Sequence, residues 1–170
     1  MFLALFLSLL PPTSPAQSGP QARVIGVHDG DTLTVLIEGR QVRVRLLDID
    51  APELGQPFGT RSKQSLSELC FGKRAELDVR SHDRYGRTLA HVHCAGRDAN
   101  AEQVRRGYAW AYVRYAPPES PLHALEREAR MARRGLWGDP DPTPPWDWRR
   151  NGRHSLLAPA ASPLTATSPQ

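Results

Sequence analysis

The chain has 170 residues, enough for one domain with a modest hydrophobic core. Its composition, 39% hydrophobic and 24% charged, is ordinary for a soluble globular protein and excludes a fibrous or wholly disordered chain. Arginine carries most of the formal net charge of +4, because Lys63 and Lys73 are the only lysines, and this charge weakly favours a polyanionic partner. The prolines concentrate toward the two ends, so the folded part is expected to be shorter than the chain.

The first part of the chain has the pattern of an export signal. Residues 1–22 carry no charged side chain, and residues 2–10 form an apolar run. This run is too short to span a bilayer, which needs about 20 apolar residues. We expect a secretory signal peptide over residues 1–18, cleaved near residues 16–18, although no Lys or Arg precedes the run. The protein is therefore expected to be secreted or periplasmic; a buried N-terminal segment is the alternative.

Three strands are expected after the leader. Residues 23–28 form the first, and a turn follows at residues 29–31. In residues 33–37 and 42–46, apolar and polar side chains alternate with the period of a strand. The connection near Gly39 makes these last two a hairpin.

A helix is expected next, at residues 61–70, with Leu66, Leu69 and Cys70 on one side and Gly72 just beyond its end. The Ser120-Pro121 pair is a typical helix start. The remaining expected elements are strands at residues 75–79 and 89–93, a short helix at 100–106, and a helix from Ser120 to Gly135.

This order of elements is typical of an α+β protein built on a five-stranded OB-type barrel with about three helices. We place this domain at residues 23–138 and expect a monomer. Residues 139–150 are a Pro- and Trp-rich extension, expected to be extended at first and to lie against the domain surface. Residues 151–170 are expected to be a disordered tail, because they contain little to bury.

The chain contains two cysteines, Cys70 and Cys94. In an exported protein, two cysteines indicate one disulfide. Two separate buried thiols are the alternative.

Four acidic or basic residues fall at strand ends or turns of the first half: Asp31, Arg45, Asp50 and Glu53. Asp31 begins one strand of the hairpin and Asp50 follows the other, so the register brings them side by side. Carboxylate oxygens are hard ligands that suit Ca²⁺ or Mg²⁺. Turn-capping aspartates are the alternative.

Hydrolysis of a phosphodiester would use such a set. It needs a divalent cation, cationic hydrogen-bond donors for the developing negative charge, and a base for the attacking water. Glu53 is close enough in sequence to Asp50 to reach the same water. Arg45 points away from the apolar face, and Arg87 is the first residue of a strand after a tight turn. Solvated surface charges are the alternative for each arginine.

Three sequence blocks resemble the staphylococcal nuclease (thermonuclease) family. They are residues 27–32 (VHDGDT), 44–53 (VRLLDIDAPE) and 83–87 (DRYGR), and the similarity continues through Asn100, Val104, Arg105, Gly107 and the Gly-Leu-Trp run at 135–137. Blocks in this order and spacing are far more specific than a lone glycine motif. The resemblance covers roughly residues 23–137 and implies an OB-fold barrel with three helices.

The resemblance also implies roles for the candidate residues. Asp31, Asp50 and the backbone carbonyl of Ala51 would bind Ca²⁺, Glu53 would be the general base, and Arg45 and Arg87 would hold the phosphate, with Arg87 nearer the leaving 5′-oxygen. Family members cut DNA and RNA and leave 3′-phosphate ends. The founding member has threonine where Ala51 stands, but only the carbonyl is needed as a ligand.

Substrate contacts are expected from Arg84, Tyr85 and Tyr115, although the tyrosines could equally be packing residues. Tyr108, Trp110 and Tyr112 are expected in the core.

The sequence therefore favours a secreted Ca²⁺-dependent nuclease acting on DNA or RNA. The first alternative is a non-catalytic OB-fold module that binds nucleic acid or protein, and the presence of Glu53 and both arginines argues against it. The second is a periplasmic structural domain with an incidental acidic site.

Overall fold

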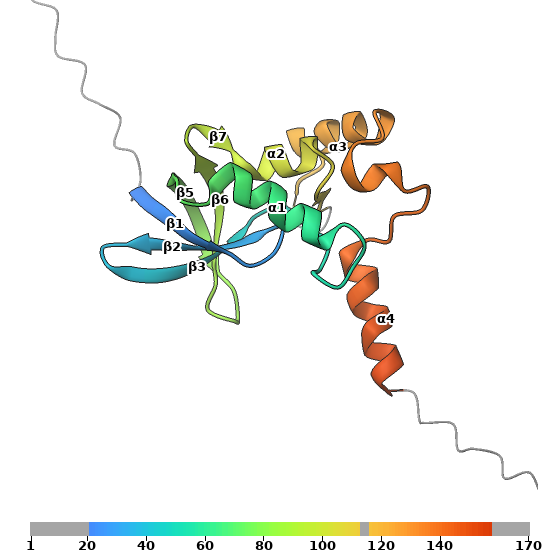
Figure 1. Ribbon diagram of the computed structural model, residues 1–170, viewed down its shortest axis with the longest axis horizontal. Coiled ribbons are helices and arrows are strands. Elements are labelled where there is room, and N and C mark those ends of the chain that lie inside the picture. The colour runs from blue at the N-terminus through green and yellow to red at the C-terminus, as the bar shows by residue number, and fades with distance from the viewer. Residues whose placement is uncertain (1–20, 113–115, 158–170) are drawn as a thin grey trace, which may run out of the picture.

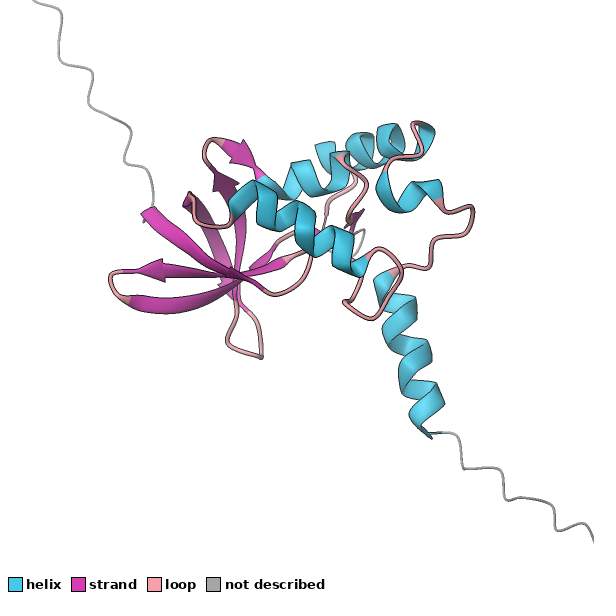
Figure 2. Cartoon of the chain, viewed as in Figure 1, coloured by secondary structure: helices cyan, strands magenta, loops and turns pink. Residues whose placement is uncertain are grey.

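The computed structural model describes residues 21–112 and 116–157. Its strands lie on one side of the molecule and its helices on the other (Figures 1 and 2). In chain order the elements are β1 (Gln21–Val27), β2 (Thr32–Ile37), β3 (Arg40–Leu46), β4 (Ile49–Asp50), α1 (Gly59–Cys70), β5 (Arg74–His82), β6 (Thr88–Cys94), β7 (Arg97–Asp98), α2 (Ala99–Arg105), β8 (Trp110–Ala111), α3 (Pro121–Met131), the 3₁₀ helix η1 (Gly135–Gly138) and α4 (Pro145–Leu157).

Within the described residues, five strands close into a barrel. β1 pairs antiparallel with β2 and with β5, while β2 pairs antiparallel with β3 and β5 with β6. A parallel pairing of β3 with β6 closes the ring. β7 continues the sheet beyond β6, and β4 pairs with β8. The predicted α+β fold with a five-stranded OB-type barrel is confirmed.

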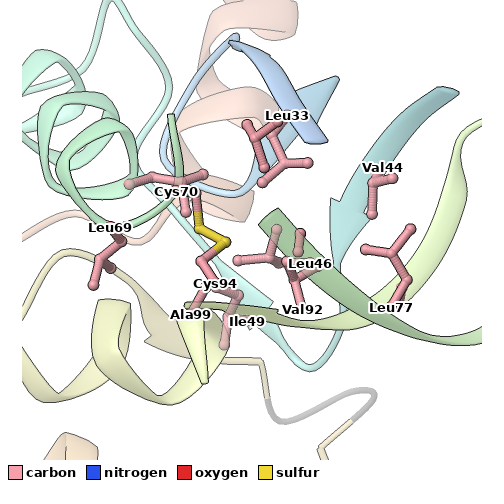
Figure 3. Packing of buried hydrophobic residues seen from close by; sticks show 14 of the residues in the cluster. Leu33, Val44, Leu46, Ile49, Leu69, Cys70, Leu77, Val92, Cys94 and Ala99 are labelled. Atoms are coloured by element: carbon pink, nitrogen blue, oxygen red, sulfur yellow. A yellow bond between two sulfur atoms is a disulfide. The ribbon is translucent and has the colours of Figure 1, made fainter. Parts of the chain in front are cut away.

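Alternating side chains fill the barrel. Along β6, buried and half-buried positions alternate strictly, as the two-residue period of a strand requires. Leu33 from β2 and Val92 from β6 are fully buried and belong to the same core (Figure 3). α1 contributes the apolar face that the sequence predicted, Leu66, Leu69 and Cys70, to the same core.

α3 begins where the Ser120-Pro121 pair predicts, and α2 also begins just after a capping residue. Asp98 precedes α2, and its carboxylate accepts a hydrogen bond from the backbone N–H of Ala101 at 3.0 Å. Ser120 precedes α3, where its hydroxyl accepts from the backbone N–H of Leu122 at 3.4 Å and Pro121 starts the helix.

A close backbone contact joins the ends of α2 and α3. Gly107 and Gly135 both have positive φ, and a Cβ added to either would lie 2.2 Å from a backbone carbonyl oxygen. The carbonyl of Gly107 accepts a hydrogen bond from the backbone N–H of Leu136 at 2.8 Å. Only glycine fits this contact, so the two loops are locked against each other.

The expected disulfide is present. It joins Cys70, the last residue of α1, to Cys94, the last residue of β6, across a sequence separation of 24 residues, and both residues are buried (Figure 3). The alternative of two separate thiols is therefore wrong.

The C-terminal part departs from the sequence expectation. Helix α4 runs over Pro145–Leu157, so residues 151–157 are helical and the expectation of disorder from residue 151 is wrong for them. No helix was expected here, because proline and small residues are frequent in the C-terminal part of the sequence. Residues 158–170 lie outside the described residues, as does the signal peptide expected at 1–18.

Across residues 21–112 and 116–157, no helix has the length and apolar character needed to cross a membrane.

Removal of the disulfide should lower the free energy of unfolding. Closing a loop of 24 residues restricts the unfolded chain, an effect of about 3 kcal/mol. We expect the double variant Cys70→Ala/Cys94→Ala to lose about this amount in urea denaturation. Thiol titration of the denatured, unreduced parent should find no free thiol. A double variant as stable as the parent would contradict the prediction.

Candidate active site

The turn between β1 and β2 brings Asp31 to the end of the hairpin. In the β2–β3 register Thr32 lies opposite Arg45, and the backbone N–H of Leu46 donates to the carbonyl of Asp31 at 2.8 Å. Gly30 sits against Ala51 and α1 so closely that an added Cβ would lie 2.7 Å from the Ala51 Cβ and 1.8 Å from the Ser62 hydroxyl. This packing fixes the turn beside residue 51.

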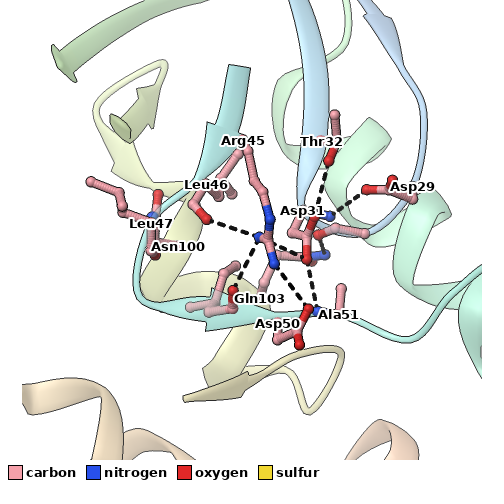
Figure 4. Close-up of polar contacts among 12 residues, drawn as sticks. Asp29, Asp31, Thr32, Arg45, Leu46, Leu47, Asp50, Ala51, Asn100 and Gln103 are labelled. Atoms are coloured by element: carbon pink, nitrogen blue, oxygen red, sulfur yellow. Dashed lines mark hydrogen bonds and ion pairs between the residues drawn. The ribbon is translucent and has the colours of Figure 1, made fainter. Parts of the chain in front are cut away.

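The Asp31 carboxylate is held by two hydrogen bonds. Its Oδ2 accepts from the backbone N–H of Ala51 at 2.9 Å, and its Oδ1 accepts from the Thr32 hydroxyl at 3.0 Å (Figure 4). Asp50 precedes Ala51 and its side chain is only 1% exposed. The structure thus brings together the three residues that were expected to bind a cation.

Arg45 lies between the two aspartates (Figure 4). Its Nη1 is 3.2 Å from Asp31 Oδ2, and its Nη2 donates to Asp50 Oδ1 at 2.9 Å. Nη1 also faces the carbonyl of Ile49 at 3.3 Å, while the side chain is 17% exposed. The guanidinium therefore neutralises a nearly buried acidic cluster.

The electrostatics of the cluster reflect this burial. Burial acts to lower the pKa of Arg45, but the charges of Asp31 and Asp50 outweigh it and raise that pKa. Burial raises the pKa of Asp50, partly opposed by hydrogen bonds from an arginine described below. Burial and the neighbouring Asp31 raise the pKa of Asp29 from 3.8 to about 6. The pocket therefore holds carboxylates that need positive charge.

Glu53 extends from the loop after this cluster. Its side chain is 40% exposed, unlike those of the aspartates. Its backbone is fixed by Gln56, whose side-chain oxygen accepts from the Glu53 N–H at 3.2 Å and whose backbone N–H donates to the Glu53 carbonyl at 2.9 Å. The first turn of α1 packs on the same carbonyl, because a Cβ at Gly59 would lie 1.9 Å from it. Glu53 is therefore an accessible carboxylate on a fixed loop.

An arginine that the sequence analysis did not single out reaches this cluster from α4. Nη1 of Arg149 donates to Glu53 Oε1 at 2.7 Å and lies 3.3 Å from Asp50 Oδ1, while Nη2 donates to Asp50 Oδ2 at 2.6 Å. These two acids raise the pKa of Arg149 against the opposing effect of its burial. No sequence motif marked this residue, because it lies almost a hundred positions from its partners.

The β5–β6 turn presents a second basic group. Arg87 Nε donates to Asp83 Oδ2 at 2.7 Å, and the Arg87 backbone N–H donates to the other carboxylate oxygen at 3.0 Å. Partial burial acts to raise the pKa of Asp83, but hydrogen bonds from Arg87 and the backbone of Tyr85 hold it below its ordinary value. Arg84 lies over the Tyr85 ring, 4.9 Å from its centre. Asp83 therefore orients Arg87, while Arg84 is held by Tyr85.

Two adjoining clefts connect these groups. One, of about 620 Å³, is lined by the carboxylates Asp31, Asp50 and Glu53 together with Arg149 and Gly152. The other, of about 540 Å³, extends along residues 46–49 and Leu89. Both clefts are lined by Arg45, Arg84, Tyr85, Arg87 and Tyr112. All the predicted catalytic residues therefore face one continuous opening.

The aromatic expectations have mixed outcomes. Trp110 is buried as expected. Tyr112 is half-buried and faces both clefts, so its assignment to the core was wrong. Tyr108 is also half-buried and lines a separate groove with α1. Tyr85 is exposed at the cleft, whereas Tyr115 lies outside the described residues.

The donor set fits a hard divalent cation, although within the described residues no group of three His, Cys, Asp or Glu side chains was found that could hold one. Asp31, Asp50 and the Ala51 carbonyl offer oxygen ligands only, the type that Ca²⁺ prefers. The guanidinium of Arg149 already occupies the position beside Asp50 and Glu53 as a stand-in cation. Water would have to complete the coordination of a metal ion here.

Comparison with known proteins places the chain in a family. The profile described as staphylococcal nuclease homologue matches residues 43–139, which is more than half of the chain. The chain belongs to this family, and the resemblance inferred from the three sequence blocks is confirmed.

Several relatives are similar over most of their length. A protein named micrococcal nuclease from Shigella flexneri is 41% identical over 83% of this chain and 87% of its own. Protein ParB of Escherichia coli is 42% identical over 87% of this chain and 89% of its own. A protein named uncharacterized endonuclease from Haemophilus influenzae is 44% identical over 79% and 75%, respectively.

Loss of the Arg45 guanidinium should destabilise the fold. The variant Arg45→Gln leaves Asp31 and Asp50 with less compensating charge, and removing one partner of a buried pair costs about 3 kcal/mol or more. Urea denaturation measures the loss, and Arg45→Lys should recover part of it. Arg43→Gln, an exposed change on the same strand, is the matched control and should have little effect. Equal stability of the two Gln variants would contradict the prediction.

Proposed function

We propose that the chain is an exported, Ca²⁺-dependent nuclease that hydrolyses phosphodiester bonds of DNA or RNA and leaves 3′-phosphate ends. As a member of its family it is a phosphodiesterase of the nuclease type. The observation that carries the proposal is the convergence of Asp31, Asp50, Glu53, Arg45 and Arg87 on one cleft. A non-catalytic module would not need this full set.

The two arginines would bind the scissile phosphate. Arg45 comes from β3 and Arg87 from the turn just before β6, and both line the two clefts, so their guanidinium groups can approach a phosphate from different directions. Arginine's planar fork suits the oxygens of a phosphate. Because negative charge accumulates on these oxygens in the transition state, the bonds strengthen as the reaction proceeds. We assign Arg87 to the side of the leaving 5′-oxygen.

Glu53 would act on the attacking water. Its side chain is more accessible than those of Asp31 and Asp50. It would accept the proton of a water whose oxygen forms a bond to phosphorus while the bond from phosphorus to the 5′-oxygen breaks. The 5′-oxygen takes a proton from solvent water as it departs, Glu53 returns its proton to solvent, and the phosphate stays on the 3′ side.

Asp31, Asp50 and the carbonyl of Ala51 would hold Ca²⁺, which supplies positive charge to the phosphate oxygens and lowers the repulsion between substrate and attacking oxygen. The carboxylates are kept in place by the backbone N–H of Ala51 and by Arg45.

Arg84 and Tyr85 would contact the substrate beside the scissile phosphate. Both line the two clefts, and the Tyr85 ring is exposed, so it can stack on a base or contact a neighbouring phosphate. We retain Tyr115 as a third candidate from the sequence. We further propose that the protein acts as a monomer.

Cleavage should depend on calcium. We expect added Ca²⁺ to support cleavage of denatured DNA and excess chelator to abolish it, with restoration when Ca²⁺ is returned. Duplex DNA and RNA should be assayed in parallel to determine the preferred substrate. Mass spectrometry of a cleaved oligonucleotide should find a phosphate on the 3′ end. Equal cleavage with and without chelator would remove the metal from the mechanism.

Glu53→Gln and Arg87→Ala should each lower kcat by about 10²-fold or more, because one removes the base and the other a donor to the developing charge. Glu76→Gln and Arg80→Ala, exposed changes on β5, are the matched controls and should retain parental kcat. Urea denaturation should find all four variants folded. A near-normal kcat in either site variant would exclude that residue from catalysis.

Export should remove the leader. When the full chain is expressed in a bacterium with a secretory pathway, the mature protein should begin near residues 17–19, as intact-mass measurement can determine. Recovery of the chain with its first 18 residues in the cytoplasmic fraction only would contradict export.

A further inference from the structure

Helix α4 inserts a cation into the acidic cluster. Arg149 uses both terminal amino groups, so that its fork spans Asp50 and Glu53 with contacts of 2.6 and 2.7 Å. Both oxygens of Asp50 are occupied, since Arg45 also donates to Oδ1. Arg149 therefore contacts the carboxylates that would bind the metal and activate the water. It does not lie where we expect the phosphate to bind.

The docking of the α4 amino-terminal end directs this side chain. Trp146 stacks on Tyr112 at 5.4 Å between ring centres and meets the edge of Trp110 at 6.3 Å. Arg149 follows three residues later, on the same face of the helix. The Gln56 side chain also donates to the carbonyl of Thr143, just before the helix. Tryptophan packing thus positions Arg149 over the carboxylates.

The same helix is attached mainly at this end. Figure 1 shows α4 running away from the barrel and from α1. On the described part of the helix, Trp148, Arg150 and Asn151 are exposed, as is Gly152 at the edge of the cleft. Because these described side chains are not buried against the barrel, displacement of α4 from the cleft need not disturb the barrel core.

A divalent cation and the Arg149 fork cannot occupy the cluster together. Ca²⁺ binds carboxylate oxygens at about 2.3–2.6 Å, the space that the guanidinium now fills beside Asp50, and the two positive charges repel. We propose that α4 is an autoinhibitory arm: Arg149 holds the cation position, and a divalent cation must displace it. This inference rests on the proposed cation site and adds a regulatory element to it.

Displacement has a measurable consequence. If the closed arm blocks the site, the apparent dissociation constant for the cation rises in inverse proportion to the open fraction of the protein. Opening the arm by mutation should therefore strengthen cation binding.

Calorimetric titration of the full mature chain with Ca²⁺, without substrate, tests this. We expect Arg149→Ala to bind Ca²⁺ about tenfold or more tightly than the parent. Arg150→Ala is the matched control, because Arg150 carries the same charge on the same helix but is exposed and pairs with Asp147. It should bind as the parent does. Equal affinity of all three proteins would overturn the arm while leaving the cation site intact. No binding by any of them would overturn the cation site and the arm together.

Hydrogen exchange distinguishes displacement of α4 by Ca²⁺ from a second explanation, in which Arg149→Ala only removes a positive charge that repels the cation. In the parent, added Ca²⁺ should speed amide exchange in residues 146–152, because the arm leaves the cleft. In Arg149→Ala these amides should already exchange faster without the cation, with a smaller further effect. Unchanged or slower exchange in the parent on Ca²⁺ binding would overturn displacement, and would mean that Arg149 remains part of the loaded site.

Discussion

Two nearly buried carboxylates, Asp31 and Asp50, share one corner of the barrel, and the guanidinium of Arg45 between them makes this arrangement tolerable. Without positive charge the carboxylates would repel each other in a medium that screens poorly. The β2–β3 register supplies Arg45 opposite Thr32, next to Asp31. The remaining demand for positive charge is what supports the proposed cation site in this corner. The barrel, through its hairpin, therefore determines both the position and the chemistry of the cleft.

Local patterns predicted much of this frame. The period of two along β2 and β3 gave the hairpin register, and the register alone placed Asp31 beside Asp50. The Ser120-Pro121 pair predicted the start of α3. The tight turn predicted that Arg87 begins a strand, whereas Arg87 lies one residue before β6. Only the structure brings it to the same cleft as Arg45. Contacts between residues that are close in sequence could therefore be predicted from sequence patterns.

Contacts between segments that are far apart in the sequence could not be predicted in this way. Arg149 reaches Asp50 across 99 positions, and its place depends on Trp146 packing against Tyr112. The composition of residues 139–157 pointed to an extension and a disordered tail, because proline and small residues conceal a helix whose docking is tertiary. Tyr112 was missed for a related reason: an aromatic side chain in an apolar stretch is typical of a core, whereas this one forms the wall shared by both clefts and the support for α4.

The disulfide between α1 and β6 matters for the cell that makes the protein, because a nuclease can cleave that cell's own nucleic acid. The link joins Cys70 to the strand that closes the barrel against β3, which carries Arg45. In a reducing cytoplasm the bond does not persist, and the chain is less stable by about 3 kcal/mol, out of about 5–15 kcal/mol for an average domain. On the proposed export route, oxidation follows translocation. The most stable form of the enzyme, with the disulfide formed, is then separated by a membrane from the genome that encodes it.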